Sequence, residues 1–326
     1  MKSRLNEILG IKYPILQGAM ARIADADLAS AVSNGGGLGI IASGGQSAQW
    51  LREQIKKARS LTDKPFGVNL MLLAPNIDEL VDVVCEERVA AVTTGAGNPG
   101  KYMPKLLAAD IKVIPVVASV ALAVRVARIG AHAVITEGCE AGGHIGETTT
   151  MALVPQVADA VDIPVLAAGG IADGRGISAA FMLGAEGVQV GTRFLVANEC
   201  NVAQNYKNAI LKAKDTDTCA TGRSTGHPVR VIKNKLAREI LSLEKKNADP
   251  AEIEKLCTGT LVMAVEDGDT DHGSVMSGQI AGLVKKEQPA AEIISEMFEE
   301  AEKIYENRSD FFRTGCAVSG NGKKSV

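Results

Sequence analysis

The chain has 326 residues, of which 46% are hydrophobic and 3% are aromatic, and its formal net charge is −3. This length suits one large α/β barrel that carries an insertion. Nucleic-acid binding is excluded, because it needs a positive field and aromatic stacking surfaces. No apolar run reaches the roughly 20 residues that span a bilayer, and the N-terminal residues lack the apolar core of a signal peptide. We therefore expect a cytoplasmic protein with no membrane partner.

Short apolar runs alternate with helical patterns about every 25 residues, which is typical of βα units around a parallel sheet. The runs predict strands that are nearly continuous in apolar residues, at 14–17, 38–41, 66–70, 91–94, 112–116, 133–136, 164–167 and 187–190. Apolar positions three and four apart predict helices at 25–34, 48–62, 77–87, 101–109, 120–129, 149–160 and 174–183. Eight parallel strands favour a closed (β/α)8 TIM barrel, with a doubly wound open sheet as the alternative.

After the last predicted strand this alternation stops. Residues 198–274 contain helical patterns and polar loops without a strand pattern, and a helix at 290–307 then resumes the barrel. We predict a barrel formed by 1–197 and 275–310, and a mainly helical cap formed by 198–274 over the barrel mouth. The Gly- and Ser-rich tail at 311–326 is expected to be flexible.

The spacing of cysteine and histidine argues against a metal site or a disulfide framework. The six cysteines are scattered without a CxxC pair, and the four histidines show no HExxH spacing. We therefore expect reduced thiols and no bound metal. Cys139 is the one cysteine close to a candidate site residue, and nothing in the sequence marks it as an activated nucleophile.

The segment 137–150, EGCEAGGHIGETTT, places His144 among glycines directly after an apolar strand. Gly142, Gly143 and Gly146 let the backbone approach a flat ligand without a Cβ in the way. This context favours a catalytic histidine. The alternative is a surface-loop histidine that only hydrogen-bonds its neighbours.

In a TIM barrel the residues that follow each strand face the active site. Gly169, Gly170, Gly191 and Thr192 follow the seventh and eighth strands, where such barrels bind phosphate through loop N–H groups and a short helix, here 192–197. Neither loop matches GxGxxG or GxxxxGK[ST]. The phosphate is therefore expected to belong to a mononucleotide such as FMN.

Six motifs carry a resemblance to a known family. They are QGAM (17–20), FGVNLML (66–72), TTGAGNP (93–99), EAGGHIGETTTM (140–151), AAGGIADGRG (167–176) and LGAEGVQVGTRF (183–194). Together they resemble the FMN-dependent, flavoprotein type of bacterial enoyl-[acyl-carrier-protein] reductase (FabK type), within the nitronate monooxygenase-like superfamily. The similarity covers about residues 14–283. Nitronate monooxygenases share the barrel, the FMN and the AGGH histidine, so oxidation of nitronates is the alternative function.

This resemblance implies FMN across the barrel mouth and His144 as the catalytic residue. The implied FMN-binding residues are Gly18, Ala19, Met20, Asn69, Ser119, Glu137, Gly142, Gly143, Ala168, Gly169, Gly170, Gln189, Gly191 and Thr192. Glu137 can accept hydrogen bonds from ribityl hydroxyls, with a salt bridge to a barrel residue as the alternative. The implied reaction reduces trans-2-enoyl thioesters on acyl carrier protein with NADH or NADPH. We expect a homodimer, and the resemblance leaves dependence on a monovalent cation open.

The predicted cap is locally basic. Between positions 207 and 238 two acidic residues, Asp215 and Asp217, accompany the basic residues Lys207, Lys212, Lys214, Arg223, Arg230, Lys233, Lys235 and Arg238. Such a patch would attract an acidic carrier protein, and the alternative is an ordinary solvated surface.

Overall fold

The structure is a computed structural model that describes residues 3–313, with side chains as far as residue 307. The predicted tail from residue 314 onward and its Cys316 lie outside the described residues. The described helices include none that is both long enough and apolar enough to cross a membrane.

Eight parallel strands form a barrel. They are β1 (Ile15–Gln17), β2 (Gly39–Ala42), β3 (Phe66–Met71), β4 (Ala91–Gly95), β5 (Lys112–Val117), β6 (Val134–Glu137), β8 (Val165–Ala168) and β9 (Gly187–Val190). Hydrogen-bonded neighbours follow the order β1-β9-β8-β6-β5-β4-β3-β2, and a parallel bridge between Leu16 and Leu38 links the two ends of this row. The predicted TIM barrel is confirmed, and each strand lies within one residue of its predicted bounds.

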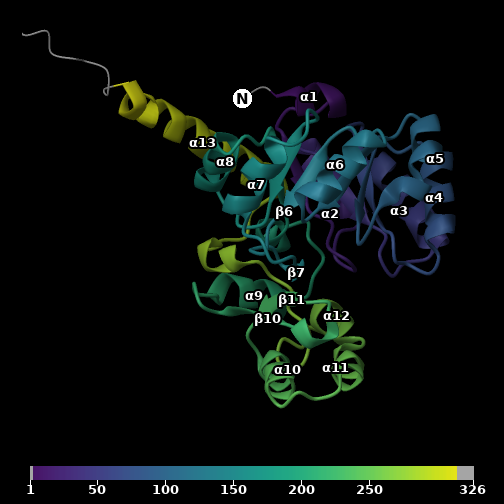
Figure 1. Ribbon diagram of the computed structural model, residues 1–326, viewed down its shortest axis with the longest axis vertical. Helices are drawn as coiled ribbons and strands as arrows, with labels where there is room; N and C mark the ends of the chain where they lie inside the picture. The colour runs from purple at the N-terminus through teal and green to yellow at the C-terminus, as the bar shows by residue number, and fades with distance from the viewer. Residues whose placement is uncertain (1–2, 314–326) are drawn as a thin grey trace, which may run out of the picture.

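Helices surround the barrel. They are α1 (Arg4–Leu9), α2 (Ala26–Asn34), α3 (Ala48–Leu61), α4 (Ile77–Glu86), α5 (Met103–Ala108) with the 3-10 turn η1 (Pro99–Lys101), α6 (Val120–Arg128), α7 (Thr150–Ala158), α8 (Gly174–Met182) and α13 (Ala290–Arg313). Helix α1 was not predicted from the sequence. Its Leu5 and Leu9 pack with Leu16, Ile114 and Leu166 in the cluster that fills the barrel interior. Helix α1 therefore closes the end of the barrel that lies away from the cap (Figure 1).

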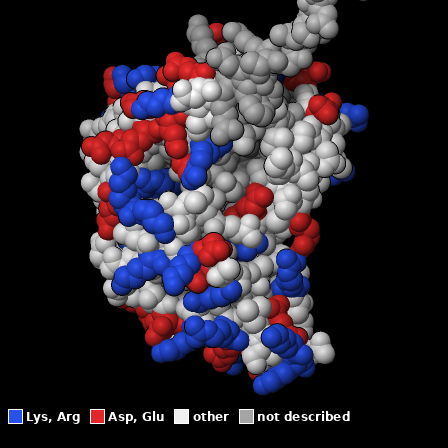
Figure 2. Space-filling model, turned by 90° about the vertical axis from the view of Figure 1, so that its left-hand side faces the viewer, with Lys and Arg blue, Asp and Glu red and all other residues white. Residues whose placement is uncertain are grey.

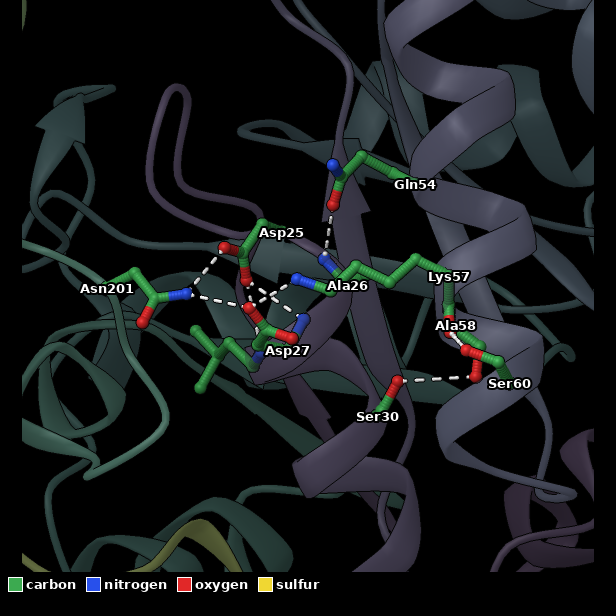
Figure 3. Close-up of polar contacts among 10 residues, drawn as sticks. Asp25, Ala26, Asp27, Ser30, Gln54, Lys57, Ala58, Ser60 and Asn201 are labelled. Atoms are coloured by element: carbon green, nitrogen blue, oxygen red, sulfur yellow. Dashed lines mark hydrogen bonds and ion pairs between the residues drawn. The ribbon is translucent and has the colours of Figure 1, made fainter.

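The chain beyond the last barrel strand is tied back to α2 (Figure 3). The Asp25 carboxylate caps α2 by accepting from the backbone N–H groups of Asp27 and Leu28, each at 3.1 Å. The Asn201 amide donates to Asp25 and to Asp27, each at 2.9 Å. Lys57 of α3 pairs with Asp27 at 2.7 Å. One carboxylate cluster thus holds α2, α3 and the start of the cap together.

The cap follows β9 and the 3-10 turn η2 (Thr192–Val196). Its elements are α9 (Gln204–Lys212), β10 (Thr218–Thr221), η3 (Arg223–Thr225), β11 (Val229–Ile232), α10 (Lys235–Lys245), α11 (Pro250–Cys257), α12 (Thr260–Val262) and the π-helix η4 (Met263–Asp267). The 3-10 turn η5 (Gln279–Leu283) comes after the cap and leads back to α13. The expectation of no strands in this region was wrong. Strands β10 and β11 pair antiparallel, and β11 also pairs with β7 (Gly143–His144), which comes from a barrel loop. Both cap strands are short, and β7, which pairs with β11, is distant in sequence, so no local alternation of apolar and polar residues predicts the sheet.

Candidate active site

A cavity of about 490 Å³ lies at the C-terminal ends of the barrel strands, beneath the cap. Its size is within the range of small-molecule and cofactor sites. All but one of the predicted site residues line it: His144, Gly18, Ala19, Met20, Asn69, Glu137, Gly142, Gly143, Ala168, Gly169, Gly170, Gln189, Gly191 and Thr192.

Ser119 is the one predicted cofactor-binding residue that the structure does not place at this cavity. Strand β5 ends at Val117, and the chain turns at once into α6. The Ser119 hydroxyl caps that helix by accepting from the N–H of Leu122 at 3.3 Å, and it does not line the cavity.

The inward-facing positions of the strands supply the polar groups of the cavity. Side chains alternate along a strand, and Ile135 belongs to the interior cluster, so Glu137 also faces inward. Asn69 donates from its amide nitrogen to the Thr93 hydroxyl at 3.0 Å, which fixes the orientation of the amide. Asn69 also lines the cavity, so its remaining donor and acceptor capacity is available to a ligand with polar edges.

Glu137 is a carboxyl group that lies deep in the barrel and keeps part of its surface toward the cavity. Burial raises its pKa from 4.5 to about 7. In the described part of the chain no basic side chain lies within ion-pair distance of Glu137, so the structure rejects the salt-bridge alternative. A buried carboxyl without a partner is suited to receive hydrogen bonds from a bound molecule.

The glycines after β1, β8 and β9 bring the backbone to the cavity surface. Gly18 donates its N–H to the Val190 carbonyl at 2.8 Å, and a Cβ added at Gly18 would lie 3.2 Å from Cα of Gly191. Gly170 has a φ of +79°, which a side chain rarely adopts. Among the described residues, the N–H groups of Gly170 and Gly191 have no acceptor. Unpaired N–H groups in glycine loops are a favourable site for an anionic group.

The histidine loop is held from the cap side. In the ladder between β7 and β11, Gly143 lies opposite Arg230 and His144 lies opposite Val229. The Arg230 side chain also donates to the Cys139 carbonyl at 3.0 Å. Because a Cβ at Gly142 would lie 2.6 Å from the backbone nitrogen of Gly278, only glycine fits there without a shift of the chain.

The exposed surface of His144 faces the cavity. Burial lowers the pKa of His144 below its ordinary value, and the neighbouring His227 lowers it further. His144 is therefore neutral near pH 7, with one ring nitrogen as a donor and the other as an acceptor. This is a group that can either donate a proton or remove one.

The residues that the cap and the segment directly after it contribute to the cavity were not predicted from the sequence. They are Tyr206, Gly226, His227, Pro228, Leu261, Met276, Gly278 and Ile280. His227 lies between Gly226 and Pro228 in the sequence, and this turn-forming context could have indicated a histidine in an exposed loop. The other residues are apolar or glycine, and nothing local distinguishes them from core residues.

Comparison with known proteins places this fold and site in a family. The model of the nitronate monooxygenase family matches residues 2–83 and 74–300. The chain belongs to the nitronate monooxygenase family. This membership supports the predicted class, a flavin-dependent oxidoreductase with a TIM barrel.

Individual relatives differ in their named activities. FabK from Thermotoga maritima is similar at 49% identity with a TM-score of 0.93, covering 95% of this chain and 99% of that one. A Staphylococcus saprophyticus protein named "Probable nitronate monooxygenase" is 36% identical over 87% of this chain and 94% of its own length. A Rhodococcus jostii dehydrogenase, named for a hydroxy-methyl-oxo-octahydro-indene carboxyl-CoA, is 39% identical over 74% of this chain and 68% of its own length.

Proposed function

We propose that this protein is an FMN-dependent enoyl-[acyl-carrier-protein] reductase, which reduces the double bond of trans-2-enoyl thioesters with NADH or NADPH. The observation that carries the proposal is the similarity to FabK at 49% identity, which extends through barrel and cap over 95% of the chain. The similarity to a dehydrogenase named for a CoA thioester supports the same substrate class.

The residues of the cavity fit FMN. Gly170 and Gly191 offer unpaired N–H groups to the phosphate, and the partnerless carboxyl of Glu137 can accept from ribityl hydroxyls. Asn69 and Gln189 present amides that can match the polar edge of a flavin ring. When bound, FMN would supply the redox chemistry by which hydride passes from the nicotinamide nucleotide to the β-carbon of the enoyl group.

His144 serves the second half of this reaction. Negative charge develops on the thioester carbonyl oxygen as the β-carbon accepts hydride, and an N–H donor at that oxygen stabilises the charge. A neutral imidazole supplies this donor and can pass a proton to the product. The antiparallel pairing with β11 holds the histidine in place, so little reorganisation is needed during the reaction.

Oxidation of nitronates is the second candidate, because the family model and the Staphylococcus saprophyticus relative carry that name. In this case His144 would act as a base toward a nitroalkane, and its lowered pKa also suits that role. Oxygen would then take the electrons.

One experiment separates the two candidates. The purified protein is examined for bound flavin, and NAD(P)H consumption with crotonyl thioester is compared with oxygen uptake on a nitroalkane. We expect rapid consumption of NAD(P)H that depends on the thioester. Oxygen uptake with the nitroalkane, and no thioester-dependent oxidation of NAD(P)H, would establish the second candidate instead.

We further propose acyl carrier protein as the partner, with the basic side of the cap as its docking surface. Two of the eight basic residues between positions 207 and 238 are buried and do not belong to this surface. Lys207 is buried and donates to the Ala197 carbonyl at 2.7 Å, and Arg230 is buried beneath the histidine loop. The exposed basic residues are Lys212, Lys214, Arg223, Lys233, Lys235 and Arg238. Figure 2 shows Lys and Arg side chains over the lower part of the molecule, where the cap lies, interspersed with acidic ones.

A further inference from the structure

The cap contains a second cavity, of about 310 Å³, which adjoins the main one. His144, His227, Leu261 and Met276 line both cavities and therefore mark the junction between them. None of the residues assigned to the cofactor lines the second cavity, so this space is free for a different group.

One wall of this cavity is a face of the three-stranded sheet. Thr221 lies opposite Val229, and Val229 lies opposite His144, so these three residues form a row across β10, β11 and β7. Val231 is two residues beyond Val229 on the same face, and it also lines the cavity. One end of a ligand that lies along this wall therefore contacts His144.

Helices α10 and α11 form the opposite wall, and Figure 1 shows them on the side of the cap sheet away from the barrel. Their contribution is mainly aliphatic: Leu236, Ile240 and Ile253 form an apolar cluster of their own, and Ala237 and the Cys257 thiol also line the cavity. Glu254 is the one carboxylate of the lining, and it is exposed to solvent.

The polar side chains of the lining are largely satisfied within the protein. Asn234 donates to the carbonyls of Thr270 and Gly273, each at 2.8 Å, and accepts from the N–H of Ala237 at 2.9 Å. Hydroxyls that bond to backbone carbonyls belong to Thr221, Thr225, Thr258 and Thr260. The wall thus offers few hydrogen bonds to a ligand, and it favours an apolar one.

We propose that the second cavity receives the aliphatic acyl chain of the substrate. This inference rests on the proposed function, since it requires a thioester that reacts beside His144. The carbonyl carbon and the β-carbon of an enoyl thioester are two bonds apart, so the chain beyond the β-carbon begins at the junction of the two cavities. Acyl chains then extend between the sheet and the two helices.

The test is a series of 2-enoyl-CoA substrates from four to twelve carbons with the flavin-loaded enzyme. Each methylene removed from water strengthens binding about fourfold, so kcat/KM rises with chain length until the chain fills the cavity. Val231→Phe narrows the cavity and lowers the ratio of kcat/KM for ten carbons to that for four carbons by about tenfold or more. Ala220→Leu, on the opposite face of the same sheet, is the matched control and keeps the ratio of the parent.

A binding measurement separates this inference from the proposed function. Saturated acyl-CoA thioesters of four and ten carbons are titrated into the parent and into Val231→Phe. If the parent binds the ten-carbon thioester more tightly than the four-carbon one and Val231→Phe does not, the second cavity binds the acyl chain, even if no enoyl thioester is reduced. Should Val231→Phe not fold, Val231→Ala widens the cavity and shifts the preferred length upward.

Two results overturn the inference. If kcat/KM depends on chain length in the same way in the parent, Val231→Phe and Val231→Ala, the acyl chain does not bind in the second cavity. An equal loss for short and long chains in Val231→Phe, together with the parent's chain-length profile in Val231→Ala, also overturns the inference, because the smaller alanine does not displace β11.

Discussion

Glu137 provides the most quantitative test of the site. Burial raises its pKa from 4.5 to about 7 in the folded protein without ligand. Since a tenfold change in an acid constant is worth about 1.4 kcal/mol, the ionised carboxylate costs the folded state about 3 kcal/mol. Between pH 4.5 and 7 the folded state holds a proton that the unfolded state has released, so stability falls as pH rises through this window and then levels off.

Glu137→Gln replaces the titrating group with a neutral amide of similar shape. We expect the free energy of unfolding of the variant, relative to that of the parent, to increase by about 3 kcal/mol between pH 4.5 and pH 8.5. Guanidinium denaturation of both flavin-free proteins across this range measures the difference. Glu79→Gln, at an exposed position on α4, is the matched control for the replacement of one carboxylate by an amide.

Bound FMN should reverse this effect. Hydroxyl groups that donate to Glu137 favour the carboxylate and lower its pKa, so saturating FMN should shrink the pH-dependent difference between Glu137→Gln and the parent. Parallel pH profiles in the flavin-free proteins would refute the raised pKa. A difference that FMN leaves unchanged would remove Glu137 from the cofactor site.

Three further predictions concern the chemistry, the cofactor and the partner. His144→Ala should keep its flavin and its reduction by NAD(P)H in stopped-flow experiments, while turnover of enoyl thioester falls roughly 10²–10⁴-fold; an equal fall in flavin reduction would contradict the assigned role. Gly191→Val should weaken FMN binding in a titration without unfolding the protein, because a Cβ there meets only the Met20 sulfur, at 3.9 Å; unchanged affinity would remove this loop from the site. Charge reversal at Lys212, Lys214 and Arg238 together should raise KM for the carrier-bound substrate and leave KM for crotonyl thioester unchanged, and equal changes for both would exclude this docking surface.

The barrel could be predicted from the sequence because its signal is local. Each strand is a nearly continuous apolar run, and each following helix carries its own periodicity, as in the segment from Phe66 to Glu86. Helix α1 escaped prediction because six residues are too few to establish a period. The cap sheet escaped for a different reason: β7 has two residues, and its partner β11 follows about 85 positions later along the chain.

The barrel side of the site was predictable for the same reason, and the cap side was not. Once strand ends are known, the barrel geometry alone brings residues such as Asn69, Glu137 and Gly191 to one mouth. Ser119 shows the limit of this rule, because two residues after a strand the chain has already turned into a helix. His227 and Met276 reach the cavity through the folding of the insertion, which strand counting does not describe.

The position of His144, the proposed catalytic residue, depends on both the barrel and the cap. Only glycine fits at position 142, because the backbone of Gly278 packs directly against it. His144 gains its strand conformation by pairing with Val229 of β11. The cap that covers the cavity is therefore also the element that orients His144, and Arg230 adds a hydrogen bond from the same strand to the Cys139 carbonyl of the histidine loop. Substitutions that alter the cap wall of the second cavity act on the sheet that carries His144. A change in chain-length preference without a change in flavin reduction therefore indicates that the acyl chain contacts the second cavity. Displacement of β11 would instead lower kcat/KM for every substrate alike.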